Sequence, residues 1–212
     1  EIMYGTSESH SIQAKLTTCS NKDFNADIDG GILRDEFKKI EEKISILKNK
    51  CDAIIISGGA SAGSKDFVVN IIKKIGIIKF WKVSIKPGRP FGFGVLKNKK
   101  PILILPGNPV ACFVIFFLFG KTLLNYLQTD ITFKLNYFFV HSNFSLKKKL
   151  GREEFLRVRL QIKNGKIYAN KYSKQGAGIL NSLVWSSGLI RLKSNQTQIN
   201  KNSLLEYYPY KS

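Results

Sequence analysis

The feature that most constrains the fold is a run of four apolar residues, Ala53–Ile56, that ends directly in small residues, Ser57-Gly58-Gly59. A short apolar run without polar alternation is typical of a strand buried on both faces. Two further runs, 80–85 and 101–105, read as strands that each stop at a Pro-Gly turn. Such strands predict a layered core rather than a helical bundle.

Two segments lie between these runs and space their apolar residues as a helix does, over 36–49 and 67–75. Asp35 and Asp66 precede them and are natural N-cap residues. Alternating strands and helices predict a doubly wound α/β layer with a mostly parallel sheet.

The second half of the chain has a different period. Residues 155–162 alternate apolar and polar side chains, and Asn164-Gly165 then supplies a type I′ hairpin signal before 166–168. Further short strands are expected over 188–192 and 203–208. The pattern predicts a small antiparallel β domain, a sandwich or a barrel, with the chain divided into 1–132 and 133–212.

The charge balance points to anionic ligands. Thirty-four Lys and Arg face fifteen Asp and Glu, a net charge of +19, which attracts nucleic acid, anionic lipid or small oxyanions. The lysines are scattered and no nucleic-acid-binding motif is present, so a nucleic-acid partner is not favoured. The most apolar stretch, Val110–Phe119, is half of the ~20 residues that a membrane span needs. Closed by Gly120-Lys121, it is expected to be a buried helix, without a membrane partner.

Cysteine and histidine are too few for a local zinc site. The three cysteines, Cys19, Cys51 and Cys112, have no CxxC spacing, and the two histidines are far apart. We expect free thiols in a reducing cytoplasm.

Three loops follow the predicted strand ends, where open α/β sheets bind ligands. The first, 57–66, is rich in glycine and precedes a helix, which suits an anion. A nucleotide-binding loop of the Walker type is rejected, because the order Ser64-Lys65 reverses the required one. The second and third loops, 86–90 and 106–109, are each stiffened by two prolines. Taken alone, each of the three could be only a turn; together they favour an anion site.

Four ordered motifs carry a resemblance to a known family: Gly31–Asp35, Ser57–Asp66, Phe80–Gly94 and Pro106–Val110. In order and spacing they resemble molybdopterin molybdenumtransferases, the MoeA-type and gephyrin E-domain family. Residues 151–157 and 175–178 are similar to that family's terminal β domain. The resemblance covers essentially the whole chain and implies that it corresponds to the C-terminal part of such proteins, without two N-terminal domains.

The resemblance implies an enzyme that inserts molybdate into adenylylated molybdopterin and releases AMP, assisted by Mg²⁺. It also implies a cytoplasmic homodimer, with a molybdopterin adenylyltransferase as a possible partner. By motif position, Asp35 and Asp66 are the active-site carboxylates and metal ligands, Lys82 and Lys86 face the pterin phosphate, and Ser61, Arg89, Pro90 and Arg157 lie near molybdate. The remaining substrate-binding candidates are loop residues: Gly58, Gly59, Gly63, Pro87, Gly88, Pro106, Gly107, Asn108 and Pro109.

The chain departs from the family pattern at several positions. Arg89 stands where lysine is usual, and Ala111 and Ala177 stand where serine is usual. Each lost hydroxyl donor in a dry anion site costs roughly 1–3 kcal/mol, which predicts weaker molybdate binding. Two other interpretations stay open: a non-catalytic scaffold or remnant of the same family, and a basic nucleic-acid-binding protein.

Overall fold

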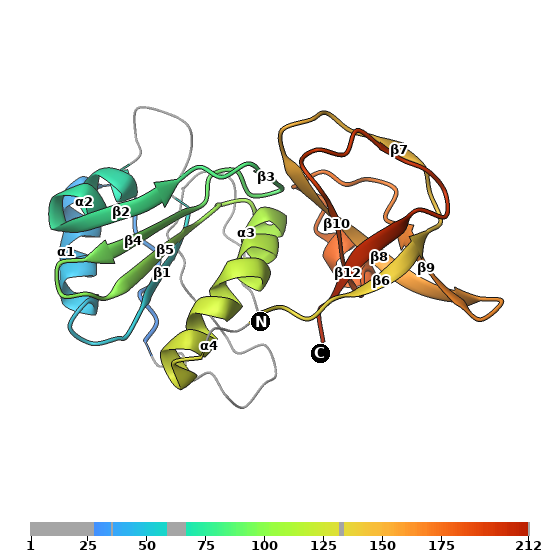
Figure 1. Ribbon diagram of the computed structural model, residues 1–212. Helices are drawn as coiled ribbons and strands as arrows, with labels where there is room; N and C mark the ends of the chain where they lie inside the picture. Colours follow the sequence, from blue (N-terminus) through green and yellow to red (C-terminus); the bar gives the residue numbers. More distant parts are fainter. Residues whose placement is uncertain (1–27, 35, 59–66, 132–133, 212) are drawn as a thin grey trace. The chain divides into compact units, whose positions relative to one another are not determined.

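A computed structural model describes residues 28–34, 36–58, 67–131 and 134–211. The chain separates into two compact units, each described by itself (Figure 1). The first unit runs to Val83 and resumes over Gly88–Asp130, while Ser84–Pro87 and the chain from Ile131 onward form the second. Four residues from a loop of the first half thus belong to the β unit, which the sequence pattern does not predict.

The first unit has a four-stranded sheet with the strand order β1-β5-β4-β2. In chain order its elements are α1 (Phe37–Leu47), β1 (Ile54–Ser57), α2 (Phe67–Ile75), β2 (Gly76–Trp81), β4 (Gly92–Leu96), β5 (Pro101–Leu105), α3 (Pro109–Ile115), the π-helical turn η1 (Phe116–Gly120) and α4 (Lys121–Thr129). The β1–β5 pair is parallel, whereas β5–β4 and β4–β2 are antiparallel. The prediction of a mostly parallel sheet is therefore wrong for the described strands, which form a mixed sheet.

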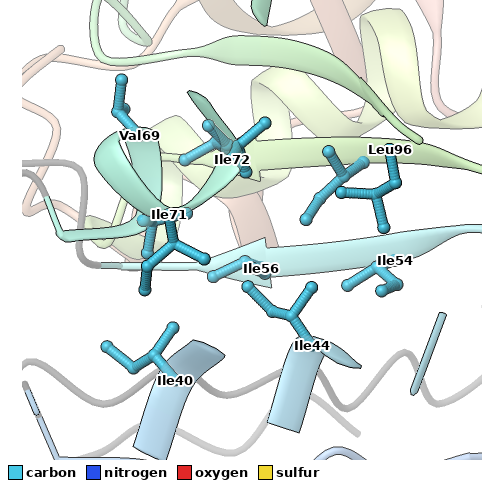
Figure 2. Packing of buried hydrophobic residues seen from close by; sticks show 11 residues of the cluster. Ile40, Ile44, Ile54, Ile56, Val69, Ile71, Ile72 and Leu96 are labelled. Carbon is cyan, nitrogen blue, oxygen red and sulfur yellow. The ribbon is translucent and has the colours of Figure 1, made fainter. Parts of the chain in front are cut away.

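The core of this unit explains why the strand β1 lacks polar alternation. Ile54 and Ile56 of β1 pack with Ile40 and Ile44 of α1 and with the apolar face of α2 (Figure 2). The intervening Ile55, which points to the opposite face of the sheet, is buried as well. Both faces of β1 are covered, so neither face needs polar side chains.

Two strand predictions in this unit need correction. The strand expected over 80–85 is wrong, because β2 ends at Trp81 and Lys82 adopts a positive φ of 64°. The strand β4 is not predicted, because its sequence Gly-Phe-Gly-Val-Leu is rich in glycine, which is depleted in strands. The helix α1 begins after Glu36 as its N-cap residue, and Asp35 and Asp66 lie outside the described residues.

The long apolar helix continues past Gly120-Lys121, where its most apolar stretch ends. It continues as one helical segment over 109–129, with a π-helical turn in the middle. Among the described helices it is the one that is long and apolar enough, by length and composition, to cross a membrane. A core helix passes the same test, and Val110, Val114 and Ile115 are fully buried. The α3 part of this segment is therefore packed as a core helix is, whereas α4 has no buried residue.

The second unit is a small barrel. It contains β3 (Ile85–Lys86), β6 (Phe138–Ser142), β7 (Leu146–Lys147), β8 (Glu153–Lys163), β9 (Lys166–Lys171), α5 (Asn181–Trp185), β10 (Gly188–Leu192), β11 (Gln198–Ile199) and β12 (Leu204–Pro209). The sheet order is β10-β12-β6-β9-β8-β3, and a further β8–β10 pairing closes the ring. Asn164 and Gly165 take positive φ values in the predicted hairpin. Most pairs are antiparallel as expected, but β6–β9 and β3–β8 are parallel.

Candidate functional site

Two of the three predicted loops start side by side. The strands β1 and β5 are parallel and in register, with Ser57 opposite Leu105, so their carboxyl ends meet at one edge of the sheet. Two hydrogen bonds hold the loop starts together: the Gly58 amide donates to the Leu105 carbonyl at 3.2 Å, and the Ser57 hydroxyl donates to the Pro106 carbonyl at 3.3 Å. The sheet thus brings the first and third loops to the same place, as predicted for a ligand-binding edge.

The backbones of these loops are in contact. A Cβ atom added to Gly107 would lie 3.3 Å from the Gly58 Cα, so a side chain there would press on the neighbouring loop. Gly107 is exposed, whereas Gly58 is buried beneath it, so the main chain of the third loop lies at the surface of this edge. The rest of the first loop, including Gly59, Ser61, Gly63 and Asp66, lies outside the described residues.

The third loop leads directly into the core helix. Asn108 is the N-cap of α3, and its side-chain oxygen accepts a hydrogen bond from the Ala111 amide at 3.4 Å, while Pro109 occupies the first turn. The cap accounts for Asn and Pro at this spacing. Asn108 therefore has a structural role as the helix cap, in addition to its predicted role in substrate binding.

Cys112, one of the three cysteines expected to be free thiols, lies beneath this edge. The Cys112 sulfur lies 3.5 Å from the Ser57 hydroxyl, whose single proton can be donated either to this sulfur or to the Pro106 carbonyl. Burial raises the pKa of the Cys112 thiol, and the hydrogen bond from Ser57 lowers it in part. A thiol with a raised pKa is poorly nucleophilic, in agreement with a packing role.

The two ends of the second loop are joined by main-chain hydrogen bonds. The Val83 amide donates to the Arg89 carbonyl at 3.0 Å, and the Lys82 amide donates to the Phe91 carbonyl at 2.9 Å. The Lys82 and Arg89 side chains are exposed. This geometry presents two cations at the base of the loop, available to an anion.

The loop is also anchored to the core helix. A Cβ on Gly88 would lie 2.4 Å from the Ile115 side chain, so the backbone of Gly88 packs directly on α3. Ile115 is seven residues beyond Asn108, about 10 Å along the helix. Pro87 and Gly88 are buried and Pro90 is half-buried, and the Lys86–Pro87 peptide bond is cis.

Lys86 belongs to the second unit and has a partner that the sequence analysis missed. It lies in β3, and its ammonium is 3.2 Å from the Glu154 carboxylate of β8. Glu154 directly precedes the alternating residues 155–162, and that pattern does not identify which strand lies beside it. The only sequence signal for Glu154 is its place in the 151–157 motif.

Arg157 is fully buried inside the second unit. Its guanidinium donates from Nε to the Ser182 hydroxyl at 2.9 Å and from Nη2 to the Gly176 carbonyl at 3.0 Å. Burial lowers the pKa of Arg157, and the nearby Tyr210 raises it in part. The Gln175 side chain also bonds to the Arg157 main chain, so this arginine holds the 175–178 segment. Its predicted place near molybdate stays a prediction.

The described residues contain no group of three or more His, Cys, Asp or Glu side chains that could hold a metal ion. The two carboxylates predicted to bind Mg²⁺, Asp35 and Asp66, lie outside the described part of the chain.

Two family models match the chain. Residues 12–126 match the probable molybdopterin binding domain, and residues 140–210 match the MoeA C-terminal region, domain IV. A molybdopterin molybdenumtransferase of Haemophilus influenzae is 32% identical over 86% of this chain and 46% of its own length. A putative molybdopterin biosynthesis protein of Methanocaldococcus jannaschii is 32% identical over 89% of this chain and 44% of its own length.

A solved structure gives the same result. The crystal structure of a molybdopterin biosynthesis MoeA protein from Pyrococcus horikosii has a TM-score of 0.70 and 26% identity, covering 86% of this chain and 43% of that one. The chain spans about half the length of these relatives. It belongs to the MoeA/gephyrin family of molybdenum cofactor biosynthesis proteins.

Proposed function

We propose that this chain is the pterin-binding and C-terminal part of a molybdopterin molybdenumtransferase. In the proposed reaction, molybdate is inserted into adenylylated molybdopterin and AMP is released. The observation that carries the proposal is the meeting of the Ser57-Gly58 and Pro106–Pro109 loops at one sheet edge, with main-chain contact between them. Backbone groups at such an edge suit a ligand that carries phosphate.

The chemistry asked of the site is the binding of anions and the cleavage of a phosphoanhydride. Lys82 and Arg89 are exposed at the base of the second loop, where they would neutralise negative charge on the pterin nucleotide and on molybdate. Arginine in place of lysine at position 89 offers a planar fork of donors and keeps its charge at any working pH. We assign Mg²⁺ to Asp35 and Asp66, where it would supply charge neutralisation for the leaving nucleotide.

The family relationship supports this function, and the length of the match limits it. The match covers 46% of one named transferase and 38% of another, so turnover by this chain alone is itself a proposal. We also propose that the protein forms a homodimer, is cytoplasmic and contacts a molybdopterin adenylyltransferase.

Calorimetric titration of the purified chain with adenylylated molybdopterin tests the proposal, with and without molybdate and Mg²⁺. We expect saturable binding that weakens in Asp66→Ala and falls with added salt. A charge-matched control is Asp52→Ala, since Asp52 is an exposed acid paired with Lys100. Absence of binding at low salt, where a chain of net charge +19 holds anions most readily, would contradict the proposal.

A further inference from the structure

The segment that contains Lys86 is fixed to the barrel through its main chain. The strand β3 pairs in parallel with β8, so that Ile85 lies opposite Glu153 and Lys86 opposite Glu154. The Glu153 amide also donates to the Ser84 carbonyl at 2.9 Å. The position of the Lys86 backbone is therefore set by β8, which leaves its long side chain as the remaining freedom.

The Glu154 carboxylate restricts that side chain. Lys86 Nζ is 3.2 Å from Glu154 Oε2, and the exposed fraction is 53% for the lysine side chain but 11% for the glutamate. A carboxylate so little exposed is held by the strands around it, whereas a free lysine side chain samples many rotamers. The ammonium has three donors, so one bond to Glu154 leaves two that can face an anion.

The other acids of the second unit are paired elsewhere. The unit contains three acidic residues, Glu153, Glu154 and Glu206. Glu153 pairs with Arg191, and Glu206 pairs with Arg191 and Lys193. Glu154 is thus the carboxylate of this unit that Lys86 contacts.

We propose that Glu154 is a positioning residue that acts through Lys86, orienting its ammonium for the phosphate of the pterin nucleotide. The inference rests on the proposed function and on the expectation, from the family resemblance, that Lys86 faces that phosphate. Removing the carboxylate frees the ammonium, so that binding has to order it again. The cost of ordering the ammonium predicts weaker binding of the nucleotide. Deleting a nearby negative charge, in contrast, predicts tighter binding, because the carboxylate no longer repels the phosphate.

A double-mutant cycle in the full chain separates these effects. The variants are Glu154→Met, which keeps the length of the side chain without an acceptor, Lys86→Met, and the double variant. We expect adenylylated molybdopterin to bind about fivefold more weakly to Glu154→Met and about twentyfold more weakly to Lys86→Met, with the double variant no weaker than Lys86→Met, a coupling typical of contacting charged groups. Glu36→Met, which removes an exposed acid of the first unit, is the charge-matched control and should leave the affinity unchanged.

Three results would overturn the inference. Tighter binding by Glu154→Met would mean that repulsion dominates, unchanged binding would mean that Glu154 does nothing for Lys86, and equal weakening with and without Lys86 would mean a purely structural role. If Glu154→Met does not fold, Glu154→Gln serves instead, with about twofold weakening expected only when Lys86 is present.

Inorganic pyrophosphate, titrated in parallel, distinguishes this inference from the proposed function. Coupling between Glu154 and Lys86 seen with pyrophosphate, in a chain that does not bind the pterin nucleotide, would leave the positioning role intact and contradict the transferase. Binding of the pterin nucleotide without coupling would do the reverse. Binding of neither ligand would overturn both.

Discussion

At the scale of single residues, the second loop depends on Gly88, where both the backbone conformation and the packing require glycine. Gly88 has a φ of +128°, which L side chains rarely adopt, and an added Cβ would lie 2.4 Å from the buried Ile115 side chain. We expect Gly88→Ala to destabilise the first unit by roughly 2–4 kcal/mol, combining backbone strain and overpacking. Urea denaturation checks this.

Gly31→Ala is the matched control for that prediction. Gly31 also has a positive φ, +75°, in the same unit, but nothing lies within 4 Å of its added Cβ. This variant should cost about 1 kcal/mol from strain alone. Equal losses in the two variants would mean that contact with Ile115 contributes nothing.

At the buried Arg157, stability depends on the geometry of the side chain as well as on its charge. Its guanidinium bonds to Ser182 and to the Gly176 carbonyl in two directions, and a lysine ammonium cannot reproduce that fork. We expect Arg157→Lys to destabilise the second unit by roughly 2–3 kcal/mol, since a buried acceptor loses its partner. Arg159→Lys, at an exposed arginine of the same strand that stacks on Trp185, should cost less than about 1 kcal/mol. Equal costs in thermal or urea unfolding would contradict this assignment.

At the scale of elements, the strands β8, β10 and β12 share an ionic network that should make the second unit pH-sensitive. Arg191 of β10 bonds to Glu153 of β8 and to Glu206 of β12, and the Tyr208 hydroxyl donates to Glu206 at 3.1 Å. Burial alone would raise the pKa of Glu206, but hydrogen bonds from Lys193 and Tyr208 and the charge of Arg191 outweigh it and lower that pKa. Burial and the contact with Glu206 raise the pKa of Tyr208 to about 12.

These shifts predict loss of stability at both ends of the pH range. Because the pKa of Glu206 is lower in the folded state, its contribution is present above the ordinary value of 4.5 and is lost as pH falls through the folded value. Because the pKa of Tyr208 is raised, its contribution is present below about pH 10 and is lost as pH rises toward about 12. Urea midpoints measured against pH should fall in both windows. Glu206→Gln should flatten the acid limb and Tyr208→Phe the alkaline limb, and limbs unchanged in these variants would contradict the assignment.

The sequence predicts the elements of this fold better than their pairing. The helix over 67–75 and the strands over 101–105 and 188–192 have the predicted bounds, because burial on both faces or one leaves a local pattern. The strand β4 could not be predicted in this way, because its glycines obscure the strand pattern. The parallel pairing of β3 with β8 could not be predicted either, because the two strands are far apart in the sequence.

For the candidate site the same limit applies. The loop residues Gly58 and Gly107 could be selected from sequence because a turn after a strand end has a local signature. Their contact with each other follows only from the parallel β1–β5 pair. Glu154, in contrast, has no local signature as a partner of Lys86, because the residue that faces it comes from a strand 68 positions earlier.

At the scale of the whole molecule, positive charge is concentrated in the barrel. Its three acidic residues are all engaged in ion pairs, whereas lysine and arginine recur along its strands and turns, as in Lys147-Lys148-Lys149. Uncompensated cations raise the local concentration of small anions in a salt-dependent way. We therefore expect the barrel to attract small anions even where its side chains touch no ligand.

The division into two units predicts that the chain unfolds in two steps. Each unit has its own hydrophobic core, and each contains one of the two tryptophans, Trp81 in β2 and Trp185 in α5. In single-tryptophan variants, Trp185→Phe leaves a reporter of the first unit and Trp81→Phe leaves a reporter of the second. We expect two distinct urea transitions, because the contacts within each unit make its unfolding cooperative. The segment Ser84–Pro87, which belongs to the second unit but lies between two parts of the first in the chain, has only four residues and is too short to couple the unfolding of the two units fully.

The destabilising variants then act as probes of that independence. Gly88→Ala should lower the midpoint seen by Trp81 much more than the midpoint seen by Trp185, and Arg157→Lys should do the opposite. Since Ser84–Pro87 belongs to the barrel although both of its neighbours in the chain belong to the first unit, a small shift of the second midpoint on unfolding of the first is also expected. Coincident transitions that move together in both variants would show a single cooperative unit, in which the pairing of β3 with β8 couples the two cores.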